Sequence, residues 1–362
     1  MNVKRNDPLF LINRPLNPGN LIQIQKEGVI LRKTGLGFES QGVLNPAIIK
    51  EGERIYMFYR AVAKNNYSTI GFCELNGPLE LSQRYNIPVL SPIGDSESRG
   101  IEDPRIVKID ERYHLTYTAF DGFNALGALA TSMDLKTFER HGIIVPVISF
   151  PEFKRLAENT GKLNEKYSRF AHDKTIITMN TRLLVWDKDV IFFPRRINNQ
   201  LYFLHRIKPD IQIVCVNKLS DLNELFWKNY LLNFNNNIVL TPRYDHEISY
   251  IGGGCPPIET TAGWLVIYHG VHDTAKGYVY SACAAMLDLE NPGKEIARLP
   301  YPLFKPETTW ELTGEVNSVC FPSGTAIFGD TLYIYYGAAD EQIACASVSL
   351  SALIATLLTF RL

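Results

Sequence analysis

Five apolar strands of this sequence end in residues that could together bind a small anion. The residues at these ends are Arg60, Thr118, Arg206, His269 and Gly337. If the ends converge, two arginines and a histidine would repel one another without an anion between them. Arginine binds phosphate and carboxylate groups through paired hydrogen bonds. The pattern predicts an anion cradle; the alternatives are arginines that brace strand edges and a hydrogen-bonded core histidine.

A second set of residues lies just before a proline in each copy of the pattern. These positions hold Asn45, Asp103, Phe193, Pro256 and Phe321. The residue before a proline favours extended backbone, which helps to fix the direction of its side chain. We therefore expect the Asp103 carboxyl group and the Asn45 amide to point to one region. Asp103 is the candidate acid, and the alternatives are a turn residue or an ion-pair partner of Arg105.

The elements that must position these residues form a fivefold repeat. Each copy has a proline-led apolar strand, a polar turn, a second apolar strand and a strand of small residues. All-strand repeats of about 40–50 residues are typical of β-propellers. The sequence predicts an all-β, five-bladed propeller that forms one domain over residues 1–362, with blades at about 41–95, 98–145, 186–235, 248–300 and 310–350.

Three segments lie outside the repeat. Residues 1–40 are expected to be a lead-in that adds a strand to the last blade. Residues 150–181 are expected to form a short, partly helical insert between the second and third blades. An irregular stretch of this length in a compact domain is usually a functional or interaction element; a solvated excursion is the alternative. The apolar residues 353–362 are expected to form a last strand.

Composition argues against several kinds of partner. The chain has 37 lysines and arginines against 38 aspartates and glutamates, so it offers no broad charged surface for nucleic acid or a membrane. No apolar run has the length of a signal peptide or a membrane span. The six cysteines contain no CxxC pair, and Cys73, Cys283 and Cys345 recur in the small-residue strands as apolar filler. These features predict a cytoplasmic protein without a metal; homo-oligomerisation stays open.

Longer motifs resemble glycoside hydrolase family 130. They run in the family's order from about Asn45 to Ala346 and include Gly100–Arg105, Tyr117–Gly122, Lys188–Pro194, Ile267–Val271 and Tyr335–Asp340. The resemblance implies a five-bladed propeller. Most characterised members of the family are inverting phosphorylases that cleave β-mannosides with inorganic phosphate, and a smaller branch hydrolyses β-1,2-mannosides.

The resemblance also implies roles for individual residues. Asp103 matches the general acid, which in the family passes its proton to the glycosidic oxygen through the 3-hydroxyl of the mannosyl unit. Positions near that mannosyl unit match Asn45, Arg60, Asp121 and Asp340. Positions on the phosphate side match Lys188, Asp189, Arg206, His269 and Tyr280. One departure is Lys188-Asp189, where phosphorylases often carry Arg-Asn; lysine keeps the charge but loses the forked geometry.

The balance of charges distinguishes two enzyme classes. An inverting hydrolase needs a second carboxylate to activate water, and Glu259, Glu315 and Asp189 are the candidates. A phosphorylase needs cations instead, because phosphate is the nucleophile. Since the cationic positions of the cradle persist, the sequence favours phosphorolysis of a β-1,4- or β-1,2-mannooligosaccharide to α-mannose 1-phosphate, with inorganic phosphate as co-substrate and no cofactor. The alternatives are a β-1,2-mannosidase and a non-catalytic glycan-binding propeller.

Overall fold

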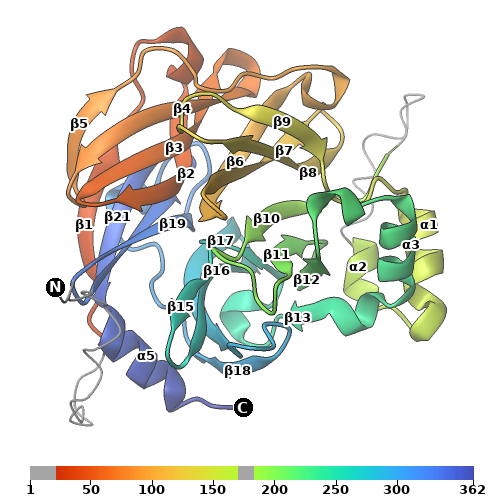
Figure 1. The fold of residues 1–362 in the computed structure, drawn as a ribbon. Coiled ribbons are helices and arrows are strands. Elements are labelled where there is room, and N and C mark those ends of the chain that lie inside the picture. Colours follow the sequence, from red (N-terminus) through yellow and green to blue (C-terminus); the bar gives the residue numbers. More distant parts are fainter. Residues whose placement is uncertain (1–21, 170–182) are drawn as a thin grey trace, which may run out of the picture.

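The fold consists mostly of β-strands, which confirms the all-β prediction. The computed structural model describes residues 22–169 and 183–362. Within these ranges the strands form four sheets, and the largest consists of two antiparallel groups joined by one parallel pair, Ser68 with Gly100. The resulting five groups follow one another around the molecule in chain order (Figure 1). Apart from small shifts at the ends and one added strand from the lead-in, the strands of each group fall within one of the predicted repeats.

Each of the first four groups is a meander of neighbouring strands. The groups are β2 (Gly42–Glu51), β3 (Arg54–Ala63), β4 (Tyr67–Asn76) and β5 (Glu80–Arg84); β6 (Gly100–Ile109), β7 (Arg112–Phe120), β8 (Ala125–Ser132) and β9 (Glu139–Ile143); β10 (Lys188–Phe192), β11 (Leu201–Arg206), β12 (Ile211–Val216) and β13 (Ile238–Leu240); β14 (Tyr250–Gly253) and β15 (Ile258–Thr260), both paired with β16 (Gly263–Thr274), then β17 (Gly277–Leu287) and β18 (Glu295–Arg298).

The fifth group joins the two ends of the described chain. It consists of β19 (Cys320–Phe328), β20 (Thr331–Ala338), β21 (Gln342–Ser349) and β1 (Gln25–Leu31). β1 pairs with β21 in antiparallel register, from Gln25 opposite Ser347 to Leu31 opposite Ile343. The expected extra strand from the lead-in is therefore present. Residues 1–21 of the lead-in lie outside the described ranges.

Hydrophobic side chains pack between consecutive strand groups. Among the described residues they form five buried clusters, and each cluster draws its side chains from two neighbouring groups. One of them joins the last group to the first, through contacts such as Tyr335 and Ile343 with Val43 and Met57. Burial of this apolar surface is the main stabilising force that holds the groups in order.

Helices cover the outside at two places. α1 (Phe150–Ala157), α2 (Glu165–Arg169) and α3 (Glu224–Leu232) lie beside the third group (Figure 1). α1 and α2 fall in the segment expected to be an insert, and residues 170–181 of that segment lie outside the described ranges. The predicted final strand is wrong: α5 (Leu350–Leu358) is a helix, whose Leu353 and Leu357 are buried in a core cluster. Its side chains bury at helical spacing, which a short apolar run does not distinguish from a strand.

A buried triad of glutamate, tyrosine and cation recurs in four strand groups. The glutamate accepts a hydrogen bond from a tyrosine hydroxyl on the second long strand and pairs with a cation on the outermost strand. The sets are Glu39, Tyr59 and Arg84; Glu97, Tyr117 and Arg140; Glu247, Tyr268 and Arg298; and Glu311, Tyr336 and Lys26. The third group departs from this rule, because His205 bonds to Asp187 and to Tyr230 of α3.

Each of these buried sets includes the residue that directly precedes a strand end. Tyr59, Tyr117, His205, Tyr268 and Tyr336 come directly before the five strand-end residues described above. A buried carboxylate is tolerated only when it is paired and hydrogen-bonded. The triads therefore hold the strand ends in place while they link the inner and outer strands of a group.

In the described residues, no helix is long and apolar enough to cross a membrane.

We predict that Glu97→Gln destabilises the protein by about 3 kcal/mol, because Arg140 and the Tyr117 hydroxyl lose a buried charged partner. The free energy of unfolding, measured in urea by tryptophan fluorescence, tests this. Glu165→Gln is the control, since its ion pair with Lys162 is mostly exposed and is expected to contribute little to stability. Equal unfolding midpoints for the two variants would contradict the role of the triad.

Candidate active site

The sheet register aligns the five predicted strand ends. Each end residue lies opposite one residue of the preceding strand, and the pairs are Leu44 with Arg60, Glu102 with Thr118, Lys188 with Arg206, Gly252 with His269 and Phe321 with Gly337. The next residues are then Asn45, Asp103, Asp189, Gly253 and Pro322. The assignment of Phe193, Pro256 and Phe321 to the same positions as Asn45 and Asp103 is wrong. The prolines of the third and fourth groups lie farther along the chain, and Phe321 occupies the position of Leu44 and Glu102, one residue earlier.

A β-bulge occurs at this position in four of the groups. The register shifts just after Leu44, Glu102, Lys188 and Pro322. Asn45, Asp103 and Asp189 all have positive φ, at 50°, 50° and 54°. The extended backbone expected before Pro46 and Pro104 is therefore wrong. A bulge places one extra residue on its strand and re-aims the side chains, and asparagine and aspartate tolerate this left-handed conformation better than most residues.

The bulge brings Asp103 against three partners. Asn45 Nδ2 donates to Asp103 Oδ1 at 2.7 Å, Arg60 Nη1 lies 3.6 Å from the same oxygen, and Lys188 Nζ lies 3.7 Å from Oδ2. The Asp103 residue is only 9 % exposed. Burial by itself raises the pKa of Asp103, but the charges of Lys188 and Arg60 and the Asn45 hydrogen bond outweigh it and lower the pKa to about 2. In the free protein Asp103 is thus a carboxylate.

Glu102 is a site residue that the sequence analysis missed. Its Oε1 accepts a hydrogen bond from Arg60 Nη2 at 2.8 Å, and its Oε2 accepts one from Lys188 Nζ at 3.3 Å. The cations of the expected cradle are therefore compensated by carboxylates and do not stand empty. The motif that contains Asp103 could have pointed to it, but adjacent strand residues normally face opposite sides, and only the bulge turns both to one side.

Asp189, Arg206 and His269 form a second cluster next to the first. Arg206 Nε lies 3.1 Å from Asp189 Oδ2, and Arg206 Nη1 donates to His269 Nε2 at 3.3 Å. Burial, followed by the charge of Arg206, lowers the pKa of His269 well below its usual range. The imidazole is therefore neutral and carries its proton on Nδ1, which is buried without a hydrogen-bond partner among the described residues. Both Asp189 oxygens also lack a well-aligned donor there, so this cluster has polar groups available for a ligand.

Two glycines allow these side chains to approach the strands. A Cβ at Gly252 would lie 2.4 Å from His269 Nε2 and 2.6 Å from Asp189 Oδ2. A Cβ at Gly337 would lie 2.1 Å from Asn45 Oδ1. The small strand-end residue Gly337 thus provides room for Asn45, whose amide orients Asp103.

Asp340 and Tyr280 lie at the edge of the clusters. Burial raises the pKa of Asp340 to about 6, with the negative charge of Asp103 adding to the effect and the charge of Arg60 opposing it. The Tyr280 hydroxyl lies 2.6 Å from that of Tyr250. Burial raises the pKa of Tyr280 too, while Arg206 and Lys188 lower it. Both residues are within electrostatic range of the cations.

Other residues have different partners from those the sequence analysis considered. Asp121 accepts hydrogen bonds from the backbone N–H groups of Phe123 and Asn124, at 2.8 and 2.6 Å, so its carboxylate organises a loop. Arg105 is buried and donates to the backbone carbonyls of Asp103, Pro104 and Gly254 and not to the Asp103 carboxylate. The suggested Asp103–Arg105 ion pair is therefore wrong.

Of the three candidate bases for a hydrolase, one lies apart from the clusters and one is exposed. Glu259 accepts two hydrogen bonds from Arg195 and is partly exposed. It lies opposite Trp264 on β16, five residues from His269, or roughly 17 Å along a strand. Glu315 is exposed. Asp189 alone among the candidates contacts the cluster residues.

One group of described residues has metal-ligand types close together. Ligand atoms of His246, Glu247 and Cys283 lie within 4.8 Å of one another. Glu247 is already bound by Tyr268 and Arg298, and burial raises the pKa of the Cys283 thiol well above its usual range. A metal would need a thiolate here, so we assign this group to the buried triad.

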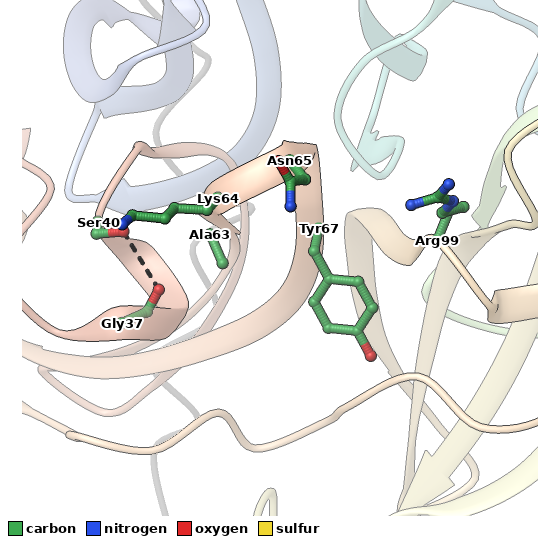
Figure 2. A pocket seen from close by; sticks show the side chains of 7 residues that line it. All are labelled: Gly37, Ser40, Ala63, Lys64, Asn65, Tyr67 and Arg99. Carbon is green, nitrogen blue, oxygen red and sulfur yellow. Dashed lines mark hydrogen bonds between the residues drawn. The ribbon is translucent and has the colours of Figure 1, made fainter.

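An open pocket of about 440 Å³ is lined by Gly37, Ser40, Ala63, Lys64, Asn65, Tyr67 and Arg99. Figure 2 shows Tyr67 with Asn65 above it, and Arg99 to the right of both. Arg60 of the charged cluster bonds to a residue beside this lining: its Nε donates to Ser68 Oγ at 2.9 Å, and Ser68 follows Tyr67 in the chain. An exposed tyrosine ring with surrounding hydrogen-bond donors is suited to a polyhydroxylated ligand.

Comparison with known proteins reveals close sequence and structural relatives. A family model described as beta-1,4-mannooligosaccharide phosphorylase, that of glycoside hydrolase family 130, matches residues 36–358. The chain is 32 % identical over 339 residues to a 1,2-beta-oligomannan phosphorylase of Thermoanaerobacter sp. (strain X514), covering 90 % of this chain and 96 % of that protein. A beta-1,2-mannobiose phosphorylase of the same strain is 31 % identical over 329 residues, covering 86 % and 91 %.

The solved structure of Beta-1,2-Mannobiose phosphorylase from Listeria innocua, in complex with beta-1,2-mannobiose, has a similar fold. It superimposes with a TM-score of 0.69 at 22 % identity and covers 93 % of this chain and 99 % of that chain. At this identity the superposition shows the fold alone.

We predict that Asp340→Asn removes an ionisation near pH 6 from the pH profile of ligand binding or activity. The raised pKa means that the Asp340 carboxyl group is protonated below about pH 6 and ionised above it. The amide mimics the protonated form at every pH. A profile measured between pH 4.5 and 8 that keeps the same inflection in the variant would contradict this assignment, and Asp330→Asn, on an exposed turn, is the control.

Proposed function

The chain belongs to glycoside hydrolase family 130, and we propose that it is a phosphorylase that cleaves β-mannosides with inorganic phosphate to give α-mannose 1-phosphate. One observation carries the proposal: four cationic or neutral-imidazole side chains, Arg60, Lys188, Arg206 and His269, surround Asp103 and Asp189 at aligned strand ends. The names of the relatives, all mannoside phosphorylases, support it.

We further propose that the five strand groups are the blades of a single propeller, which forms one catalytic domain. The aligned bulges, and the hydrophobic clusters between every pair of consecutive groups including the last and the first, support this architecture. The clusters then lie near the propeller axis. The buried free cysteines are consistent with a reducing compartment such as the cytoplasm.

Phosphorolysis fits the charges better than hydrolysis. A water-activating base must be a free carboxylate on the opposite side of the sugar from the acid. Glu259 is bound to Arg195 far along the strand, and Asp189 lies 3.1 Å from Arg206 Nε. The cations, in contrast, can bind a phosphate dianion and orient its attack. His269 Nδ1–H adds a neutral donor for the same ligand.

In the proposed reaction Asp103 acts as the general acid. A phosphate oxygen attacks the anomeric carbon from the face opposite the leaving group and forms the new C–O bond, while the bond to the leaving oxygen breaks. The proton of Asp103 passes to the mannosyl 3-hydroxyl, whose own proton moves to the leaving oxygen. Asn45 orients Asp103, and Arg60 and Asp340 lie near the mannosyl unit. Attack from the opposite face inverts the anomeric configuration.

We place the leaving part of the oligosaccharide in the pocket beside Arg60. Tyr67 offers a ring for a sugar face, and Arg99, Lys64 and Asn65 offer hydrogen bonds (Figure 2). The relatives with the longest alignments act, by their names, on β-1,2-linked substrates. A β-1,2-mannooligosaccharide is therefore the substrate of first choice, with the β-1,4-linked isomer as the comparison.

We predict that the protein cleaves β-1,2-mannobiose only when phosphate is present and that the product is α-mannose 1-phosphate. Phosphorus NMR identifies the product and its anomeric configuration, and a parallel reaction without phosphate is the control. Free mannose as the sole monosaccharide, formed at the same rate without phosphate, would assign the protein to the hydrolases.

We also predict that Asp103→Asn lowers kcat by at least about 10²–10⁴-fold while the protein stays folded, because a positioned general acid contributes this much. Turnover of a mannobiose by the purified variant measures the loss, and circular dichroism checks the fold. Glu259→Gln is the matched control, a carboxylate-to-amide change in an ion pair outside the cluster, and it is expected to retain activity. Near-native activity of Asp103→Asn would disprove the assignment.

A further inference from the structure

The free protein holds Asp103 in the wrong protonation state for an acid. Its pKa of about 2 means that almost every molecule carries a carboxylate at neutral pH. The same two cations that keep it ionised, Arg60 and Lys188, are those that a phosphate ion would bind. Phosphate and the ionised Asp103 carboxylate therefore compete for the same positive charges, and loss of these charges favours the protonated acid.

Glu102 pairs with both of the cations that phosphate would bind. It bridges the cations, with Arg60 Nη2 on one carboxylate oxygen and Lys188 Nζ on the other, at 2.8 and 3.3 Å. Its side chain is only 8 % exposed. The two cations and the two adjacent carboxylates together carry equal positive and negative charge. A phosphate anion that binds these cations must replace the carboxylate oxygens as acceptor of their hydrogen bonds.

Glu102 differs from the buried glutamates that stabilise the fold. Those accept a tyrosine hydroxyl and pair with a cation of the outermost strand, as Glu97 does with Tyr117 and Arg140. The printed partners of Glu102 are instead the two cations of the cluster, which come from β3 and from β10, in two other strand groups. A carboxylate with these partners sets the position and the net charge of the anion site.

We propose that Glu102 is a positioning residue that holds Arg60 and Lys188 for the phosphate and couples phosphate binding to protonation of Asp103. This inference rests on the proposed phosphorylase function. When phosphate binds, its oxygens replace carboxylate oxygens as acceptors of the Lys188 and Arg60 hydrogen bonds. Asp103 then loses the charges that keep it ionised, while Glu102 remains beside it as a second negative charge that favours its protonated form.

The incoming anion can supply the proton. Dihydrogen phosphate and the Asp103 carboxylate exchange one proton to give the Asp103 carboxylic acid and monohydrogen phosphate, with no change in total charge. The acid then protonates the leaving group and the monohydrogen phosphate attacks, so Asp103 returns to its carboxylate form. The other charged or titratable groups around this pair are Asp340 from the loop after β20, Asp189 and Arg206 from the third strand group, Lys208 from the turn after β11, and Arg105 on β6. Asn45 on β2 is the neutral partner.

The variant Glu102→Gln distinguishes this coupling from a purely structural role of Glu102. Without the Glu102 charge the cations attract phosphate more strongly, so the KM for phosphate should fall by about tenfold, the lower end of the effect of one charged hydrogen-bonding group. Asp103 becomes the only carboxylate between the two cations, so its pKa falls. The descending limb of the kcat profile that reports its protonated form should then move to lower pH by about one unit, and kcat at pH 7 should fall.

The controls make each outcome decisive. Glu102→Asp retains the charge and should restore the wild-type position of the pH limb, and Glu259→Gln should change none of these quantities. A raised KM for phosphate with an unchanged pH profile would show that Glu102 only braces the cations and would overturn the proposal. A wild-type enzyme that does not depend on phosphate would refute the proposed function itself, and the coupling with it; a phosphate-dependent wild type with an unshifted Glu102→Gln profile refutes the coupling alone.

Discussion

The need to compensate buried charge governs both the scaffold and the candidate site. In four strand groups a buried glutamate is tolerable because a tyrosine hydroxyl and an outer-strand cation bind it, as Glu311 is bound by Tyr336 and Lys26. At the aligned strand ends the same requirement pairs Glu102 and Asp103 with Arg60 and Lys188. The difference lies in the partners. The triads are closed within one group, whereas the strand-end network joins three groups and retains polar atoms that lack partners.

The repeat determines where the strand ends lie, and the differences between its copies determine which side chains meet there. The aligned register, with a β-bulge in four of the groups, places one residue of each group at an equivalent point, and in sequence order these residues are an amide, two carboxylates, a glycine and a proline. The amide orients the first carboxylate, the second carboxylate lies beside Arg206, and the glycine strand leaves space for His269. A symmetric site would have placed five like groups together, which electrostatic repulsion disfavours.

The positive φ angles of Asn45, Asp103 and Asp189 connect this geometry to function. Residues other than glycine rarely adopt that conformation, and such residues often occur at active sites, where the surrounding structure compensates the strain. Here the compensation comes from hydrophobic packing between the groups and from the triads directly before the strand ends. These contacts position the site residues in the free protein, which suits a reaction that depends mainly on the orientation of phosphate and sugar.

The sequence by itself determined the all-β class, the fivefold repeat and the types of the residues at the strand ends, because period-two patterning and recurring turns are local properties. It placed Asp103, Arg60, Arg206 and His269 together because they repeat at equivalent positions. It could not show that Glu102 belongs to the site, or that Asp189 lies at the same position as Asn45 and Asp103. A bulge changes which side a residue faces without changing the apolar pattern. Nor could it show that α5 is a helix, that Asp121 serves its own loop, or that the cations already have carboxylate partners. These features depend on which strand ends meet and how far burial strengthens their charges, and only the tertiary structure decides both.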